Sequence, residues 1–181
     1  MHHGYATHRT GIALYLHISN AGSAASAIES VHLAYHWPMK PLTNLWWRNT
    51  IGWFWLTDQA AALEDFQVAI GDNVKVYPFL FQLNNLSGTS ANTYLDIGQT
   101  TNGVIYFEQG ESYGGCQPAK KDGKTKIIVR IVDAFGRKHN RRFQIPCIEL
   151  EEARTYNPSF GKTFSELHGI PLPFDITTEA E

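Results

Sequence analysis

The chain has 181 residues, 43% of them hydrophobic and 18% charged, which is the composition of a globular protein and excludes a disordered one. A single domain of this length buries roughly 70% of its extended-chain surface, so it does not depend on disulfides or metals for stability. The net charge of −2 argues against a protein whose main role is to coat nucleic acid or an anionic membrane.

Alternation of apolar and polar residues predicts two strands near the start of the chain. Residues 12–18 and 31–37 each place every second side chain on an apolar face, and turn-forming residues 20–23 lie between the two runs. We expect the two strands to be antiparallel neighbours. Their outward rows then carry His17, His32 and His36.

The alternation stops after residue 37. We predict a tryptophan-rich insertion at residues 38–65, which is irregular at first and ends in a helical turn or two at residues 60–66. Further strands are predicted at residues 74–83, 93–97, 103–107, 124–132 and 141–148, with Pro78 at a sheet edge or a bulge and a turn at residues 133–136. These strands, without intervening helices, predict an all-β fold, an antiparallel β-sandwich over residues 1–150.

Residues 151–181 are predicted to form a C-terminal extension, a short helix followed by a tail that packs on the domain or on a partner. Charge is unevenly distributed in this half of the chain: residues 120–142 hold nine Lys or Arg against two Asp, whereas residues 149–181 hold seven acids against two bases. The acidic end could fold back on the basic segment, the basic segment could meet an acidic partner, or both could be solvated surfaces.

Three segments carry a family resemblance. Residues 16–23, Leu-His-Ile-Ser-Asn-Ala-Gly-Ser, contain a hydrophobic-x-Asn-x-Gly signature between two strands. Together with residues 95–107 and the Asp-x-x-Gly turn of residues 133–136, they resemble bacterial immunoglobulin-like adhesion and accessory domains over about half the chain. The resemblance implies an immunoglobulin-like sandwich with a binding role and no catalytic residue.

Residues 110–114, Gly-Glu-Ser-Tyr-Gly, match the G-x-S-x-G nucleophile elbow and are similar to the active-serine motif of serine carboxypeptidases. The elbow requires a helix after the serine, and residues 115–118, Gly-Cys-Gln-Pro, with residues 120–123, Lys-Lys-Asp-Gly, cannot form one. Asp133 and then His139 or His168 would be the partners of Ser112. We interpret the motif as a surface loop and keep a serine hydrolase as the alternative function.

Cofactor and compartment follow from what the sequence lacks. The histidines have no carboxylate or cysteine at matched spacing, and phosphate-binding glycine loops are absent, so we expect no metal and no cofactor. Cys116 and Cys147 fit free thiols in a reducing compartment, although their spacing also permits a disulfide. We find no signal peptide and no apolar stretch of about 18 residues. A cytoplasmic protein is favoured over the soluble part of a membrane-anchored one.

Aromatic and basic side chains are the strongest binding candidates. The rings could form a patch for another protein, a stacking platform for sugars or a foothold on a membrane surface, or they could bury one another. We predict a non-catalytic binding domain whose partner is another protein or a second copy of the chain, with carbohydrate binding as an alternative and no nucleic-acid binding. The candidate binding residues are Trp46, Trp47, Arg48, Trp53, Trp55, Arg137, Arg141 and Arg142.

Overall fold

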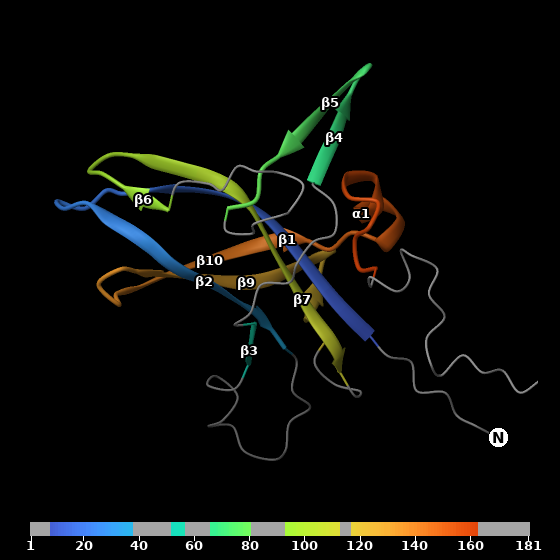
Figure 1. Cartoon of the computed structure of the whole chain (residues 1–181). Helices are drawn as coiled ribbons and strands as arrows, with labels where there is room; N and C mark the ends of the chain where they lie inside the picture. The colour runs from blue at the N-terminus through green and yellow to red at the C-terminus, as the bar shows by residue number, and fades with distance from the viewer. Residues whose placement is uncertain (1–7, 38–51, 57–65, 81–92, 113–116, 163–181) are drawn as a thin grey trace, which may run out of the picture.

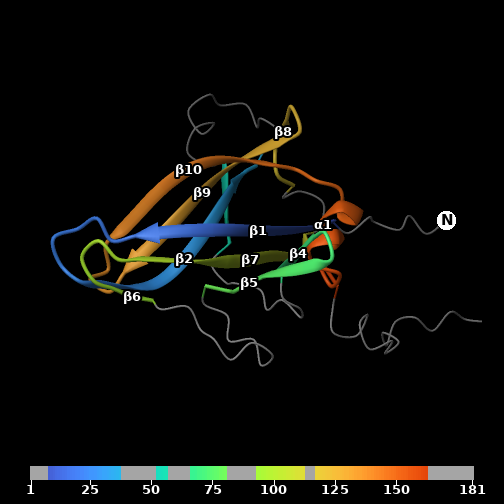
Figure 2. The ribbon, with the colours of Figure 1, turned by 90° about the horizontal axis from the view of Figure 1, so that it is seen from above.

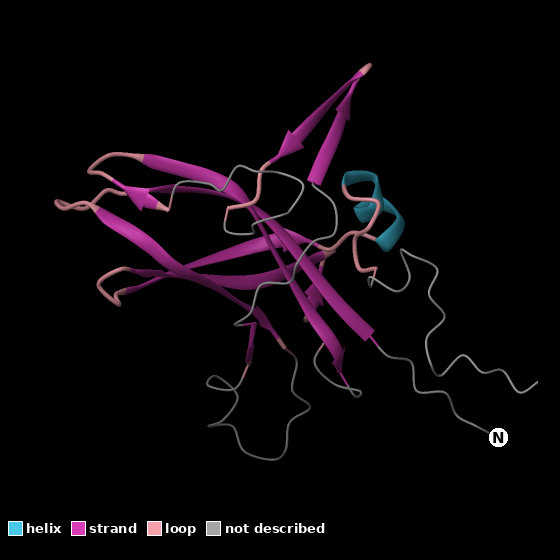
Figure 3. Ribbon diagram, in the orientation of Figure 1, coloured by secondary structure: helices cyan, strands magenta, loops and turns pink. Residues whose placement is uncertain are grey.

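The computed structural model describes residues 8–37, 52–56, 66–80, 93–112 and 117–162. Within them the chain is mostly antiparallel β-structure with one short helix, as predicted (Figure 3). In chain order the elements are β1 (His8–Ser19), β2 (Ser26–His36), β3 (Trp53–Leu56), β4 (Phe66–Ile70), β5 (Asn73–Tyr77), β6 (Tyr94–Leu95), β7 (Thr100–Ser112), β8 (Lys120–Lys121), β9 (Lys124–Asp133), β10 (Lys138–Pro146) and α1 (Leu150–Tyr156).

The long strands form two layers (Figures 1 and 2). One is the narrow sheet, in which β1 pairs with β7. The other is the wide sheet, in which β10, β9, β2 and β3 follow one another, with β6 on β2 and β8 on β9. The two sheets face each other across a shared core, which is the packing of a β-sandwich.

The core consists of alternate residues from both sheets. Ile12 of β1 and Phe107 of β7 contribute from the narrow sheet, while Leu33 of β2 and Ile127 of β9 contribute from the wide one. All four side chains are buried. The strands therefore have the period-two burial that the apolar alternation predicts.

One hydrogen bond crosses this apolar core. The hydroxyl of Tyr35, on β2, donates to Oε1 of Gln109, on β7, and both side chains are buried. The ring of Tyr35 also stacks on Phe54 of β3, with ring centroids 5.4 Å apart. Tyr35 thus links the two layers and the edge of the wide sheet.

The prediction that the first two strands are antiparallel neighbours is wrong. β1 pairs with β7, whereas β2 pairs with β9 and β3, so the turn between β1 and β2 carries the chain from one sheet to the other. Both strands have an apolar row, and burying the two rows against each other across the core satisfies the same pattern as side-by-side pairing. The alternation alone does not distinguish the two arrangements.

Asn20 fixes this crossing. Its side-chain Nδ2 donates to the carbonyls of Ala24 and Leu95, at 2.9 and 3.0 Å, and its Oδ1 accepts from the N–H of Gly22. Its backbone N–H donates to Gln99, and its carbonyl accepts from Gly98. One residue therefore joins the β1–β2 turn to the β6–β7 turn at the same end of the molecule.

The narrow sheet is also partly covered on its other side. Phe66, Phe79, Val104 and Tyr106 form a second cluster there, with Phe160 packed against it. The β4–β5 hairpin projects from this side, and α1 lies beside the base of the hairpin (Figure 1).

Several details depart from the sequence prediction. Within the predicted insertion, Trp53–Leu56 forms β3 in the wide sheet, while residues 38–51 and 57–65 lie outside the described residues. Phe66 begins β4 and is not helical. The predicted strand at residues 74–83 ends as β5 at Tyr77, because Pro78 has no N–H to donate; the carbonyl of Pro78 accepts from the N–H of Val104 on β7.

The close approach of residues 78–80 to β7 requires a glycine at position 103. A Cβ built at Gly103 would lie 2.8 Å from the backbone N and 2.9 Å from the Cα of Leu80. We expect Gly103→Ala to lower the free energy of unfolding by about 1–3 kcal/mol, because the backbone of residues 78–80 must shift away from β7. Urea denaturation measures this, and Asn102→Ala, at an exposed neighbour on the same strand, should change stability little. Equal stability of the two variants would contradict the close approach.

Tyr35→Phe tests the hydrogen bond between the sheets. We expect a loss of about 1–2 kcal/mol in the free energy of unfolding, since the Gln109 carbonyl is left buried without this donor. The double variant Tyr35→Phe/Gln109→Leu should recover part of the loss, because both polar partners are then gone. Additive losses in urea denaturation would show that the two side chains are not coupled.

Candidate functional site

The face of the wide sheet that points away from the core is called the outer face here. Its residues follow from the strand registers: Leu33 and Ile127 point into the core, so their neighbours in sequence point outward. The outer face consists of Trp53 and Trp55 on β3; Ser30, His32, Ala34 and His36 on β2; Lys124, Lys126, Ile128, Arg130 and Val132 on β9; and Lys138, Asn140, Arg142, Gln144 and Pro146 on β10.

The outer face is strongly basic. At these outward positions of β2, β3, β9 and β10 it carries five Lys or Arg side chains, two His and two Trp, and none of the residues there is Asp or Glu. Lys121 of β8 pairs with the outward Lys124 and adds a further base, while the exposed Glu29 lies on β2 at the irregularity beside Ser30. Among the described residues, no carboxylate forms an ion pair with any of the five. We call these five residues the cationic row; they are Lys124, Lys126, Arg142, Arg130 and Lys138.

Aromatic side chains border the cationic row on β3. The guanidinium of Arg130 lies over the ring of Trp55, 3.9 Å from its centroid, and its Nε donates to Oδ1 of Asn140 at 2.9 Å. Trp53 meets the ring of His36 edge to face, with centroids 5.6 Å apart. Both tryptophans are half-buried, so they are held in place while part of each ring stays accessible.

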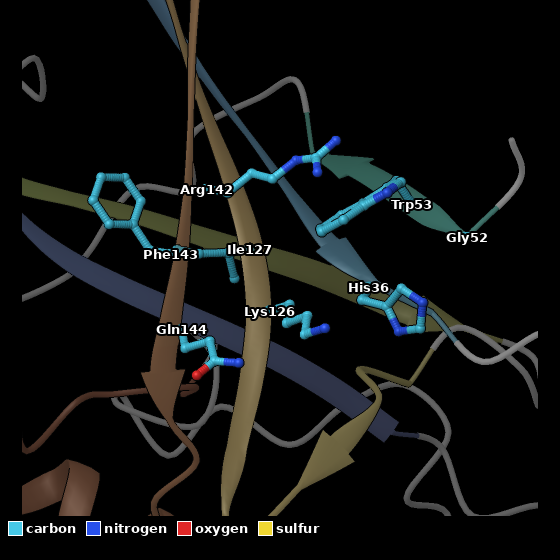
Figure 4. Close-up of a pocket in the computed structure, with 8 residues that line it drawn as sticks. All are labelled: His36, Gly52, Trp53, Lys126, Ile127, Arg142, Phe143 and Gln144. Atoms are coloured by element: carbon cyan, nitrogen blue, oxygen red, sulfur yellow. The ribbon is translucent and has the colours of Figure 1, made fainter. Parts of the chain in front are cut away.

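A shallow groove of about 820 Å³ lies on this part of the sheet and extends round β10. His36, Trp53, Lys126 and Arg142 line it together with Gly52, Ile127, Phe143 and Gln144. In Figure 4 the side chains of Arg142 and Trp53 extend toward each other over the sheet, and Lys126 lies between His36 and Gln144. The groove therefore combines cationic, aromatic and amide groups.

The predicted binding residues separate into three groups. Trp53, Trp55 and Arg142 come together on the outer face. Arg141 points to the opposite side of β10, and Arg137 lies in the β9–β10 turn, with its guanidinium 5.8 Å from the centroid of the Phe135 ring. The remaining three, Trp46, Trp47 and Arg48, lie outside the described residues.

Sequence reasoning did not single out Lys126, Arg130 and His36 as binding residues. The excess of Lys and Arg in residues 120–142 is visible in the sequence. The side of the sheet on which each of these side chains lies depends on how β9 pairs with β10 and β2. The signal was present in the spacing: Lys124, Lys126 and Arg130 occupy even positions, whereas the odd positions from Thr125 to Ile131 are apolar or buried.

The β9–β10 turn has its own polar cluster, which forms the predicted turn at residues 133–136. The carbonyl of Asp133 accepts from the N–H of Gly136, whose φ of 74° suits glycine, and Oδ1 of Asp133 accepts from the N–H groups of Phe135 and Arg137. Nε2 of His139 lies 3.0 Å from Oδ2 of Asp133. The His139 hydrogen bond chiefly holds the pKa of Asp133 below its ordinary value of 3.8.

This lowered pKa makes the turn sensitive to acid. Because the folded-state pKa lies below the unfolded one, the Asp133 charge stabilises the fold above the unfolded pKa, and this contribution disappears as the pH falls through the folded pKa. The difference in urea midpoint between wild type and Asp133→Asn should shrink as the pH falls below about 5. A difference that stays constant down to about pH 2 would contradict this.

The G-x-S-x-G motif lies at the end of β7. Ser112 is the last residue of this strand, and residues 113–116 are outside the described residues. Residues 117–119 have no regular structure and lead into β8, so no helix occurs at residues 117–121. His139 is paired with Asp133 in the β9–β10 turn, and His168 lies outside the described residues.

The predicted histidine neighbours do not meet. His17 belongs to the narrow sheet, while His32 and His36 lie four residues apart on β2, about 13 Å along the strand. In the described part of the chain, no three His, Cys, Asp or Glu side chains are grouped so that they could hold a metal ion. Cys147 is a free thiol, and Cys116 is not among the described residues.

Comparison with models of protein families, with curated proteins and with solved structures gives no match for this chain. In the described part of the chain, no helix has the length and apolar character needed to cross a bilayer.

Proposed function

We propose that this chain is a non-catalytic binding domain with an immunoglobulin-like sandwich, and that it binds an acidic protein partner on the outer face of its wide sheet. The observation that carries the proposal is the composition of that face. It gathers five Lys or Arg on β9 and β10 and two Trp on β3, with no acid at the outward positions of these three strands, in a chain whose net charge is −2. Such local charge attracts a partner of opposite sign and orients it on approach.

The aromatic side chains favour a protein over a carbohydrate. A sugar ring needs the open face of a tryptophan, and the guanidinium of Arg130 already lies over the ring of Trp55. Trp and Arg are also the residues that most often dominate the binding energy of protein interfaces. The half-buried Trp53 and Trp55 provide rigid apolar contact beside the charges.

The immunoglobulin-like architecture is supported by the chain crossing between sheets after β1 and by the clasp of Asn20 on two turns. A binding role, not catalysis, is supported by the outer face itself. Its groove has cationic and amide groups, with no carboxylate and no hydroxyl nucleophile among the lining residues.

Poly-L-glutamate is a direct probe of the proposal. We expect saturable binding to the full chain in isothermal titration calorimetry at low ionic strength, and weaker binding as salt is added, because the ion pairs form at an exposed face. The triple variant Lys126→Gln/Arg130→Gln/Arg142→Gln should lose at least tenfold in affinity, which corresponds to about 1.4 kcal/mol.

The matched control removes three charges away from the outer face. Lys75→Gln/Arg141→Gln/Lys162→Gln has the same net charge as the first triple variant, so a non-specific charge effect would weaken both equally. Retained binding in this control and loss in the first variant supports the proposal. Equal affinities of the two variants would refute it, provided that both have the thermal stability of a folded chain.

A further inference from the structure

The cationic row has a regular spacing. In the register of β9 with β10, the outward pairs along the two strands are 124 with 146, 126 with 144, 128 with 142, 130 with 140, and 132 with 138. Each of these five pairs contains one Lys or Arg and no acid. In order along the strands they are Lys124, Lys126, Arg142, Arg130 and Lys138.

Strand geometry converts this register into distances. Successive outward pairs are two residues apart, which is about 6.6 Å, so the five cations span about 26 Å. They alternate between two strands only about 4.8 Å apart, and long Lys and Arg side chains can bridge that offset. The result is a nearly linear series of positive charges with a repeat of about 6.6 Å.

We propose that the cationic row binds an extended acidic peptide that carries Asp or Glu at every second position. This inference rests on the proposed function and specifies its partner. An extended peptide places alternate side chains on one face with a repeat of about 6.6 Å, which equals the repeat of the row. Every carboxylate on that face then meets one cation.

A helical partner fits the row less well. Acidic residues four apart on an α-helix are about 6 Å apart along its axis, but each step turns the stripe by about 40°. Over the five positions of the row the stripe turns by about 160°, so only two or three carboxylates would face the sheet. An extended segment keeps all of them on one side.

Polar groups beside the row suit a peptide backbone. The amide side chains of Asn140 and Gln144 occupy the outward pairs of Arg130 and Lys126. An amide NH₂ can donate to a peptide carbonyl, and an amide oxygen can accept from a peptide N–H.

A single-stranded nucleic acid also has a regularly charged backbone, and it would need exposed ring faces for its bases. Arg130 occupies the face of Trp55, and the edge of His36 or Trp53 is used in their mutual contact. The peptide is therefore the better fit, and the oligonucleotide becomes a comparison in the experiment.

The experiment compares two nine-residue peptides of identical composition, both with blocked ends. One alternates Glu and Thr, beginning and ending with Glu, and the other has five consecutive Glu followed by four Thr. In extended form the block peptide presents three of its five carboxylates to one face. We expect the alternating peptide to bind the full chain about tenfold more tightly in calorimetry, since it keeps two more ion pairs.

Single substitutions test the register. Arg142→Gln and Lys126→Gln should each weaken binding of the alternating peptide about threefold and reduce its advantage over the block peptide. Arg141→Gln is the matched control, because Arg141 is the next residue on β10 and points to the opposite side. It should leave both affinities unchanged.

The outcomes separate this inference from the function on which it rests. Equal binding of the two peptides would overturn the alternating pattern while leaving an acidic partner in place. Failure of both peptides and of poly-L-glutamate would remove both proposals. Tighter binding of a thymidine hexanucleotide than of either peptide, lost in Trp53→Ala, would overturn the inference in favour of a nucleic acid.

Discussion

The register of β2 against β9 is the constraint on which both the core and the candidate site depend. It sets Leu33 beside Val129 and Tyr35 beside Ile127, so that these side chains enter the core together. The irregularity between Ile28 and Ser30 adds one residue to β2, so that Ile28 before it and Val31 after it are both buried while β2 stays paired with β9. A slip by one position would turn Lys126 and Arg130 inward as unpaired buried charges, which is far more costly than losing apolar contacts. The stability of the fold therefore also keeps the basic side chains on the outside.

The two sheets differ in how much of their surface is packed against other residues, and the wide sheet keeps one face open for a partner. The narrow sheet is covered by the core on one side and, over part of the other, by Phe66, Phe79 and Phe160, while Tyr15 and His17 on that side are exposed. The wide sheet has the core on one side and polar, exposed residues such as Lys126 and Arg142 on the other. Binding to the outer face would not require any of the described helices or strands to move. The residues that hold the two sheets together are therefore different from the residues proposed to bind a partner.

The sequence predicted what depends on neighbours along the chain and missed what depends on pairing. Apolar alternation identified β1, β2 and β9, and turn chemistry identified residues 133–136. The partner of β1 was assigned wrongly, because a strand buries the same row whether its partner is beside it or across the core. Trp53–Leu56 was missed as a strand because two tryptophans point outward and obscure the alternation. Trp53, Trp55 and Arg142 were identified by residue type, whereas Lys126 and Arg130 needed the register.

The two strands that carry the cationic row are supported unequally. β9 is hydrogen-bonded on both sides, by β10 and by β2, and its inward residues are buried. β10 has β9 as its only strand partner within the described residues, and on its inward row Phe143 is 47% exposed. We therefore expect the backbone that carries Lys124, Lys126 and Arg130 to open less readily than the backbone that carries Lys138 and Arg142. Such a surface could hold one edge of a bound chain in fixed alignment and let the other edge adapt to differences in side-chain length.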